Sequence, residues 1–298
     1  MGKTVILGAN GYIARNLLFV LKRDFPEEEI LLCGCEPSHA DEDNEHYIQV
    51  DLCDPEDTGR IRLDDADIIF MMVGRTGSAN GFEEYESFIR TNEITLLNLL
   101  AEYRRQNSRA KIIFPSTRLV YKGKDGPQPE SAEKEFKTIY AINKFACEQY
   151  LEQYHRVFGI RYCIFRICVP YGTLVPGASS YGTAEFMLKS VQNGQNISIY
   201  GDGTVRRTIT YIEDVCLSLI SGAFSDKCEN DVFNVGGEDY SLKEMAELTA
   251  EKYNVGVDFV PWPEQSLKIE SGDTVFDSTK LESITGFRCE KKFAEWIQ

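Results

Sequence analysis

A tyrosine and a lysine stand one helical turn apart in the stretch TIYAINK, and the two together could move a proton. Because an α-helix turns once in about 3.6 residues, Tyr140 and Lys144 would share one face of a helix that begins near residue 138. Free tyrosine has a pKa of about 10, which is too high for a base at neutral pH. A neighbouring lysine ammonium lowers this pKa because it favours the phenolate. Two unrelated surface residues would show the same spacing, so the pair indicates catalysis only if the rest of the chain supplies the other reacting groups.

Thr117 is the third residue with suitable chemistry, and it lies at the end of the apolar stretch KIIFPST. If that stretch is a strand of a parallel sheet, its carboxyl end lies at the edge where such sheets bind ligands. The helix that carries Tyr140 and Lys144 would then meet Thr117 at this edge. We expect Tyr140 to accept a proton from a substrate hydroxyl, and Thr117 to hold the oxygen of that hydroxyl.

A glycine-rich turn follows the first apolar stretch, where TVIL runs into Gly8-Ala-Asn-Gly11-Tyr-Ile-Ala14 with a helical pattern behind it. Glycine allows a tight turn and lets the backbone approach a pyrophosphate, whose charge is stabilised by the free N–H groups of a helix N-terminus. Ala14 stands at the third glycine position, which close packing of helix and strand permits. An ordinary strand-to-helix loop is the alternative, but the place of this turn on the first strand predicts dinucleotide binding.

The choice between NAD and NADP depends on the end of the second apolar run, EILLC. An acidic residue about 20 positions past the glycines would bind the adenosine ribose of NAD. Gly34 stands near that position and Glu36 follows two residues later, while no arginine follows that could hold a 2′-phosphate. We expect NAD as the cofactor, and NADP is not excluded.

Apolar runs alternate with helical patterns through the first half of the chain, which is typical of a doubly wound parallel sheet. The predicted strands are 4–7, 29–33, 47–50, 67–73 and 111–115, with helices at 12–23, 84–107 and 138–157. The second half mixes strands at 163–167, 196–200 and 231–235 with helices at 183–193, 214–224 and 242–253, the last with a capping box at Ser241 and Glu244. We expect an α/β fold, a Rossmann-type doubly wound parallel sheet with a smaller C-terminal α/β substrate-binding lobe. The predicted division is 1–165 for the NAD(P)-binding domain, to which the chain returns at about 209–235, and 166–298 for the lobe.

Composition argues against several classes of function. The formal net charge of −15 repels nucleic acid and acidic membrane surfaces. The apolar runs are shorter than the roughly 18 residues of a membrane-spanning helix. Nine cysteines scattered through apolar runs are typical of a reducing cytoplasm rather than a disulfide framework. We therefore expect a cytoplasmic location. The three histidines are isolated, so we expect no metal site.

Several motifs in this order resemble the extended short-chain dehydrogenases of the nucleotide-sugar epimerase/dehydratase group. They are Gly8-x-x-Gly11-x-x-Ala14, Asp51-Leu52, Asn92 in TNEITLLNLL, STRLVY at 116–121, Tyr140-x-x-x-Lys144, YGDGTVRRTITYIEDV at 200–215, FNVGG at 233–237 and DSTKLESITGF at 277–287. The resemblance covers nearly the whole chain, and the order and spacing of the motifs make it more specific than the tyrosine-lysine pair alone.

The resemblance implies a role for each motif residue. Those implied in cofactor binding are Gly8, Asn10, Gly11, Tyr12, Ile13, Asp51, Leu52, Asn92, Tyr140, Lys144 and Cys168. Among them, Asp51 would bind the adenine amino group and Asn92 would brace the cofactor pocket. Residues implied in binding the nucleotide-sugar substrate are Val169, Tyr200 and Arg207, and Arg207 would bind the diphosphate. The resemblance also implies a homodimer that pairs through the Tyr140 helix and the helix before residue 111.

Two departures from the family's pattern bear on the reaction. Relatives that dehydrate or decarboxylate carry acidic residues directly after the hydroxyl residue, and here Arg118 and Leu119 stand there. The simplest reaction is therefore 4-epimerisation, in which the sugar is oxidised at C4, turns over and is reduced on its other face. Val169 replaces an asparagine that often holds substrate. Taken with Gly34 near the position of the acidic residue expected for NAD, this leaves an NADPH-dependent reductase of a 4-keto-deoxysugar nucleotide as the alternative. A non-catalytic, cofactor-sensing regulator is a third hypothesis, which the presence of both Tyr140 and Lys144 disfavours.

Overall fold

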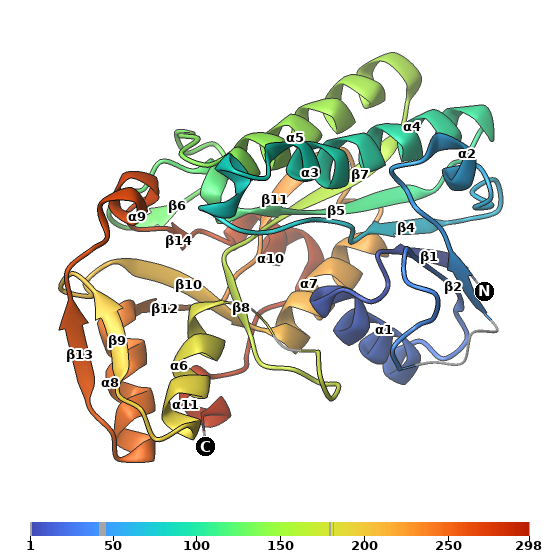
Figure 1. The fold of residues 1–298 in the computed structure, drawn as a ribbon. Helices are drawn as coiled ribbons and strands as arrows, with labels where there is room; N and C mark the ends of the chain where they lie inside the picture. The colour runs from blue at the N-terminus through green and yellow to red at the C-terminus, as the bar shows by residue number, and fades with distance from the viewer. Residues whose placement is uncertain (1, 42–45, 179, 181, 298) are drawn as a thin grey trace.

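A seven-stranded parallel sheet runs through the centre of the computed structural model, which describes residues 2–41, 46–178, 180 and 182–297 (Figure 1). Its strands are β1 (Lys3–Leu7), β2 (Glu29–Gly34), β3 (Tyr47–Gln49), β4 (Ile68–Met71), β5 (Lys111–Thr117), β7 (Arg161–Ile167) and β11 (Asp231–Asn234). Their order across the sheet is β3-β2-β1-β4-β5-β7-β11. The order reverses between β1 and β4, which is where doubly wound sheets bind dinucleotides. The predicted Rossmann-type fold is confirmed.

Helices cover both faces of this sheet (Figure 1). One face carries α2 (Pro55–Thr58), α3 (Tyr85–Ile89), α4 (Thr95–Arg105) and α5 (Ile139–Phe158), and the other carries α1 (Tyr12–Asp24), α7 (Ile212–Ala223) and α10 (Thr279–Thr285). Successive strand residues point to opposite faces. Ile112 and Phe114 therefore belong to the core beneath α4 and α5, while Ile113 belongs to the core with α1 and α7. Because both faces are covered, the central strands carry continuous apolar runs, such as IIFM in β4 and CIF in β7.

Smaller sheets form beside the large one (Figure 1). Their strands are β6 (Pro127–Gln128), β8 (Val169–Tyr171), β9 (Ile197–Tyr200), β10 (Arg206–Tyr211), β12 (Glu238–Ser241), β13 (Val257–Val260) and β14 (Val275–Phe276), arranged as β12-β10-β8, β13-β9 and β14-β6. The accompanying helices are α6 (Thr183–Gln192), α8 (Leu242–Tyr253), α9 (Glu264–Ile269) and α11 (Phe293–Trp296). A separate apolar core that includes Met187, Met245 and Phe293 holds this part together. The predicted capping box of α8 is confirmed, because Ser241 and Glu244 exchange hydrogen bonds of 3.1 and 2.7 Å.

The structure differs from the sequence prediction in two ways. The single helix predicted over 84–107 is α3 and α4 with a π-helical segment, η3 (Arg90–Ile94), between them. The short strands β6, β8, β10, β12, β13 and β14 were not predicted, because each is paired with a distant segment and carries little pattern of its own. The short helices α2, α9, α10 and α11 were not predicted either. Short 3₁₀ helices include η2 (Asn80–Phe82) and η4 (Arg118–Val120). The division at residue 165 stays a prediction. Within the described ranges, no helix has both the length and the apolar character needed to cross a membrane.

Candidate active site

The end of β5 and the start of α5 bring two predicted catalytic side chains together. Thr117 is the last residue of β5, and Tyr140 is the second residue of α5. Burial raises the pKa of Tyr140, and a hydrogen bond with the Thr117 side chain offsets part of that rise. Thr117 Oγ1 also accepts a hydrogen bond from Leu119 N over 3.2 Å. The two hydroxyls therefore meet at the carboxyl edge of the sheet.

The position of Tyr140 is set by the way α5 begins. Thr138 precedes the helix in an extended conformation, and its Oγ1 accepts a hydrogen bond from Ala141 N over 3.0 Å. Such a cap satisfies an N–H group that would otherwise lack a partner in the first turn. Since Tyr140 lies within this capped turn, its backbone is fixed relative to the sheet.

Lys144 lies one turn further along α5 and is 4% exposed. Its Nζ donates a hydrogen bond to Pro115 O over 2.8 Å and lies 4.4 Å from the centre of the Phe114 ring. Burial lowers the pKa of Lys144 to about 8, because desolvation penalises the ammonium. The lysine therefore connects α5 to β5 and can still carry a positive charge at neutral pH.

Asn92 lies in the π-helical segment, and its side chain is fully engaged by the loop after β4. Its Oδ1 accepts from Arg75 N over 2.9 Å and its Nδ2 donates to Arg75 O over 3.1 Å. A Cβ at the neighbouring Gly74 would lie 3.3 Å from Asn92 Oδ1 and 3.5 Å from Lys144 Nζ. The end of β4, Asn92 and Lys144 thus converge on one place, consistent with the tendency of π-helical turns to occur at functional sites.

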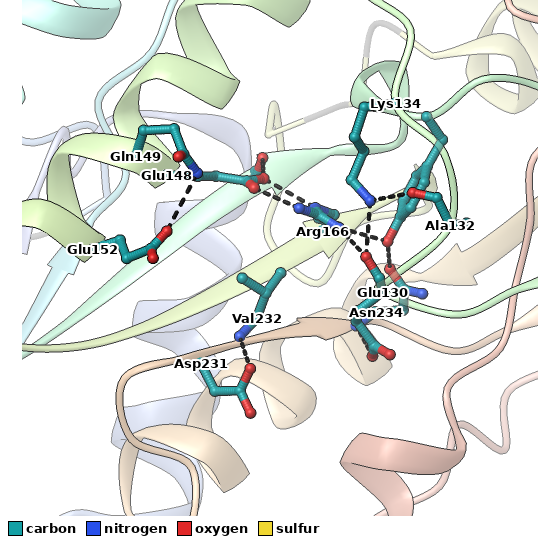
Figure 2. A network of polar contacts seen from close by, with 12 residues as sticks. Glu130, Ala132, Lys134, Glu148, Gln149, Glu152, Arg166, Asp231, Val232 and Asn234 are labelled. Carbon is teal, nitrogen blue, oxygen red and sulfur yellow. Dashed lines mark hydrogen bonds and ion pairs between the residues drawn. The ribbon is translucent and has the colours of Figure 1, made fainter.

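A buried network behind the end of β5 connects three elements (Figure 2). Glu148, one turn past Lys144 on α5, accepts a hydrogen bond from Ser116 Oγ over 2.5 Å. Its two oxygens also accept from Arg166 of β7, at 3.0 Å from Nε and 2.5 Å from Nη2. Both charged side chains are almost inaccessible to solvent, at 2% and 4%. The motifs of the sequence do not predict this pair, although the spacing of Tyr140, Lys144 and Glu148 places all three on one helix face.

The glycine turn between β1 and α1 has the form that a pyrophosphate requires. Gly8 adopts a φ of +78°, and a Cβ there would lie 2.9 Å from Val73 N. Gly11 stands at the N-cap of α1 and has no side chain with which to cap it, and the first turn contains no acidic residue. The N–H groups and the partial positive charge of this helix end are therefore open to an anion. Tyr12 and Ile13, predicted to present amides here, are the first two residues of α1.

Asn10 and Glu36 link this turn to the loop after β2. Asn10 Nδ2 donates to Ser38 O over 2.9 Å and to Glu36 Oε2 over 3.3 Å, and its Oδ1 accepts from Ala40 N over 2.9 Å. The carboxylate of Glu36 thus lies beside the glycine turn although Glu36 stands two residues later than the fingerprint expects. Arg15, which faces the same loop, is paired with Asp41.

Asp51 and Leu52 follow β3 at the same edge of the sheet. Val50 N donates to Gly34 O over 2.8 Å, so Asp51 lies next to the end of β2. Asp51 is exposed and its Oδ1 accepts from Cys53 N over 2.9 Å, whereas Leu52 is buried. Both residues therefore lie next to the loop that holds Glu36, and their contacts with adenine stay a prediction.

The predicted substrate residues are spread over two of the smaller sheets, and Cys168, which the resemblance implies in cofactor binding, lies directly before one of them. Cys168 is buried between β7 and β8, and its Sγ donates to Thr274 O over 3.4 Å. Val169 begins β8 and pairs with Ile209 of β10. Tyr200 ends β9, in a different sheet, where its half-exposed ring lies 5.1 Å from that of Trp262. The structure thus places Val169 beside the active-site edge of β7 and gives Tyr200 an aromatic neighbour.

Arg207 of β10 is 3% exposed and already has several partners. Its Nη2 pairs with the carboxylate of Glu270, and its Nη1 donates to Gly272 O over 2.5 Å and Arg206 O over 2.8 Å. Sequence analysis did not find Glu270, because 63 residues separate it from Arg207 and it lies outside every motif. A diphosphate at Arg207, as the resemblance implies, would have to share this guanidinium with Glu270.

Arg118 follows Thr117 directly and points toward the same 270–274 segment. Its Nη1 donates to Ser271 Oγ over 2.8 Å and to Thr274 Oγ1 over 3.5 Å. Burial and the nearby charge of Arg207 lower the pKa of Arg118 to about 10, which leaves it charged at neutral pH. In the part of the chain that the structure describes, no cluster of three or more His, Cys, Asp or Glu side chains could hold a metal ion.

Comparison with known proteins agrees with this arrangement. A model of the family described as "NAD dependent epimerase/dehydratase family" matches residues 4–236. CDP-paratose 2-epimerase of Salmonella typhi is 28% identical over 224 residues, which are 66% of each chain. GDP-mannose 3,5-epimerase of Arabidopsis thaliana is 24% identical over 287 residues, 88% of this chain and 72% of that protein. The structure of UDP-glucose 4-epimerase of Thermus thermophilus with NAD superposes with a TM-score of 0.85 at 22% identity, over 99% of this chain and 96% of that one.

The sheet, the glycine turn and the Thr117, Tyr140 and Lys144 cluster define an enzyme of the extended short-chain dehydrogenase class. The chain belongs to the NAD dependent epimerase/dehydratase family, which makes NAD its cofactor.

Proposed function

We propose that this protein is an NAD-dependent nucleotide-sugar 4-epimerase, which oxidises the sugar at C4 and reduces it again on the other face. The observation that carries the proposal is the meeting of the Thr117 and Tyr140 hydroxyls beside Lys144. These groups can remove and return one proton at one hydroxyl. Arg118 and Leu119, the next two residues, supply no carboxylate for elimination or decarboxylation.

Each catalytic side chain has one task in this reaction. Bound NAD would supply the acceptor and later the donor of hydride at C4. Tyr140 takes the proton of the C4 hydroxyl, and Thr117 hydrogen-bonds the same oxygen. Because burial raises the pKa of Tyr140, the phenolate needs nearby positive charge, which Lys144 provides. After the keto sugar has rotated so that its other face is reduced, Tyr140 returns the proton to the C4 oxygen.

The glycine turn suits either nicotinamide dinucleotide, and Glu36 supports NAD over NADP. The open N-terminus of α1 suits the pyrophosphate. The Glu36 carboxylate, 3.3 Å from Asn10 Nδ2, suits the ribose hydroxyls and would repel a 2′-phosphate. Arg15 is the guanidinium that faces this loop, and its pairing with Asp41 offsets its charge.

The test is to replace Tyr140 with Phe and to follow turnover and bound nucleotide together. We expect Tyr140→Phe to lose roughly 100- to 10,000-fold in kcat, the usual contribution of a general base, while still binding NAD. Tyr154→Phe, at a half-buried position on the same helix, is the control and should retain turnover. Unchanged turnover in Tyr140→Phe would contradict the proposed function.

Val169 gives a specific reason to keep the reductase as second candidate. Its side chain is apolar and 8% exposed, so it offers no amide to a substrate. The two reactions differ in nucleotide balance, since an epimerase consumes none and a 4-keto reductase consumes one NADPH per product. With substrate deuterated at C4, an epimerase also returns the deuterium to the product.

A further inference from the structure

Arg118 carries a charge that the proton transfer does not use. Its two hydrogen-bond acceptors, Ser271 Oγ and Thr274 Oγ1, are both neutral. Within the described ranges, its guanidinium forms no ion pair with a carboxylate. Removing a guanidinium from water without a counter-ion costs free energy, so the position favours an anionic ligand.

The surroundings of Arg118 have an excess of positive charge. Arg118 and Arg207 are close enough for the charge of Arg207 to lower the pKa of Arg118, and Glu270 opposes this effect. Glu270 is itself paired with Arg207. Two guanidiniums and one carboxylate leave one positive charge here, in a chain whose formal net charge is −15. The local positive charge would therefore attract an anion to this place, although the negative net charge of the protein repels anions in general.

The position of Arg118 indicates which part of the substrate carries the anion. Arg118 is adjacent in sequence to Thr117, which holds the C4 oxygen in the proposed reaction. Arg207, in contrast, is occupied by Glu270, Gly272 O and Arg206 O. A guanidinium has five N–H donors, and both bonds made by Arg118 come from Nη1. The remaining donors can bind a planar carboxylate in two-point fashion.

We propose that Arg118 binds a carboxylate on the sugar ring next to C4, so that the preferred substrate is a nucleotide uronic acid; this rests on the proposed function. Ser271 and Thr274 hold the guanidinium in place, and Arg118 determines specificity without taking part in the proton transfer. A neutral sugar with a hydroxymethyl group at the same carbon would leave the charge uncompensated.

The experiment measures binding to the NAD-loaded protein by calorimetry, without turnover. UDP, dTDP, GDP and CDP are compared first, and the tightest of them defines a matched pair, the nucleotide hexose and the corresponding nucleotide hexuronate. We expect the hexuronate to bind about 10- to 100-fold more tightly than the hexose, as charge-assisted hydrogen bonds provide. In Arg118→Gln this ratio should fall to about 1 to 3, while the free nucleotide and the hexose bind within about threefold of the wild type.

Two further variants make the result specific. Arg62→Gln removes the same charge from an exposed side chain and should leave the ratio unchanged. Ser271→Ala removes one support of Arg118 and should lower the ratio several-fold. If Arg118→Gln does not retain NAD, the Ser271→Ala ratio decides, and an unchanged ratio there overturns the proposal.

Other outcomes would also overturn it. Equal weakening of nucleotide, hexose and hexuronate in Arg118→Gln would show that Arg118 binds the diphosphate. A ratio near 1 in the wild type would show that the protein does not recognise a sugar carboxylate. Failure of all four nucleotides to bind would remove both this proposal and the epimerase. A high ratio combined with full turnover in Tyr140→Phe would remove the epimerase alone.

Discussion

At Lys144 the protein buries an ammonium that water would otherwise stabilise. Burial lowers the pKa of Lys144 from 10.5 to about 8. Between these two values the unfolded chain binds more protons than the folded chain, so the free energy of unfolding increases with pH across this range. Below about pH 8 the full cost of burying the charge is present.

Replacing this lysine should therefore stabilise the protein while removing its activity. We expect Lys144→Met to raise the free energy of unfolding at pH 7 by about 1 to 2 kcal/mol, after allowing for the lost hydrogen bond to Pro115 O. The gain should disappear by about pH 10.5. Urea unfolding of nucleotide-free protein at both pH values measures it, with the exposed Lys124→Met as control. A variant less stable than the wild type at pH 7 would contradict the account.

Thr117 should act on the pH dependence of turnover through Tyr140. Because the Thr117 hydroxyl lowers the pKa of Tyr140, Thr117→Val should raise that pKa. The pH at which kcat reaches half its maximum should then move upward, and kcat at pH 7 should fall about 100-fold. Thr117→Ser keeps the hydroxyl and is the matched control. A pH profile of Thr117→Val that coincides with the wild-type profile would show that Thr117 does not influence Tyr140.

For single residues, the sequence predicts which side chains lie together only where one motif contains both of them. Tyr140 and Lys144 are one turn apart, so their common face follows from helix geometry alone. The contact of Arg118 with Ser271 joins positions 153 residues apart, and no local pattern predicts it. Counting along the chain places Glu36 two residues past the expected position, and the structure shows its carboxylate within hydrogen-bond distance of Asn10 in the glycine turn.

At the scale of elements, α5 is held to the sheet by the Glu148 and Arg166 ion pair (Figure 2). Tyr140, Lys144 and Glu148 occupy successive turns of one face of α5. Glu148 contacts β7 through Arg166 and β5 through Ser116. The pair therefore fixes the distance between α5 and the strand that ends at the catalytic threonine.

A double-mutant cycle tests this role. Removing one partner leaves the other charge buried and unpaired, so Glu148→Met or Arg166→Met alone should cost about 3 to 5 kcal/mol of unfolding free energy. The double variant should cost less than the sum of the two, with a coupling of about 2 kcal/mol. Urea unfolding provides all four values. Additive costs within about 0.5 kcal/mol would mean that the pair does not act as a unit.

The π-helical segment marks the limit of sequence prediction for elements. The run over 84–107 has helical periodicity throughout, and one extra residue per turn at Arg90–Ile94 leaves no visible trace in it. The π-helical segment is associated with tertiary contacts rather than with a local pattern. The Asn92 side chain hydrogen-bonds the backbone of Arg75, and the Asn92 carbonyl accepts a hydrogen bond from Cys147 Sγ.

At the scale of the whole molecule, the large sheet could be predicted because its central strands β1, β4, β5 and β7 are buried on both faces. β5, for example, is buried at all seven positions, which produces the continuous apolar run that sequence shows. The smaller sheets could not be predicted in the same way. β10 pairs with β12 and β8 through contacts set by tertiary structure, and its sequence RRTITY is largely polar.

We propose that the molecule is a homodimer that pairs through α4 and α5, as the resemblance implies. Ile142 on α5 is 47% exposed and Ile89 on the adjoining α3 is 40% exposed. Ile142→Arg should place a charge in the interface and give a monomer in sedimentation experiments at micromolar concentration. Phe186→Arg, at an equally exposed position on α6, should remain dimeric. A monomeric wild type would contradict the proposal.

The central claim is that the enzyme retains NAD and recycles it during 4-epimerisation. The most direct measurement is the identity and amount of nicotinamide nucleotide released when freshly purified protein is denatured. We expect NAD at close to one molecule per chain. A protein that releases none, takes up NADPH in preference to NAD and exchanges it freely would contradict the epimerase and favour the 4-keto reductase.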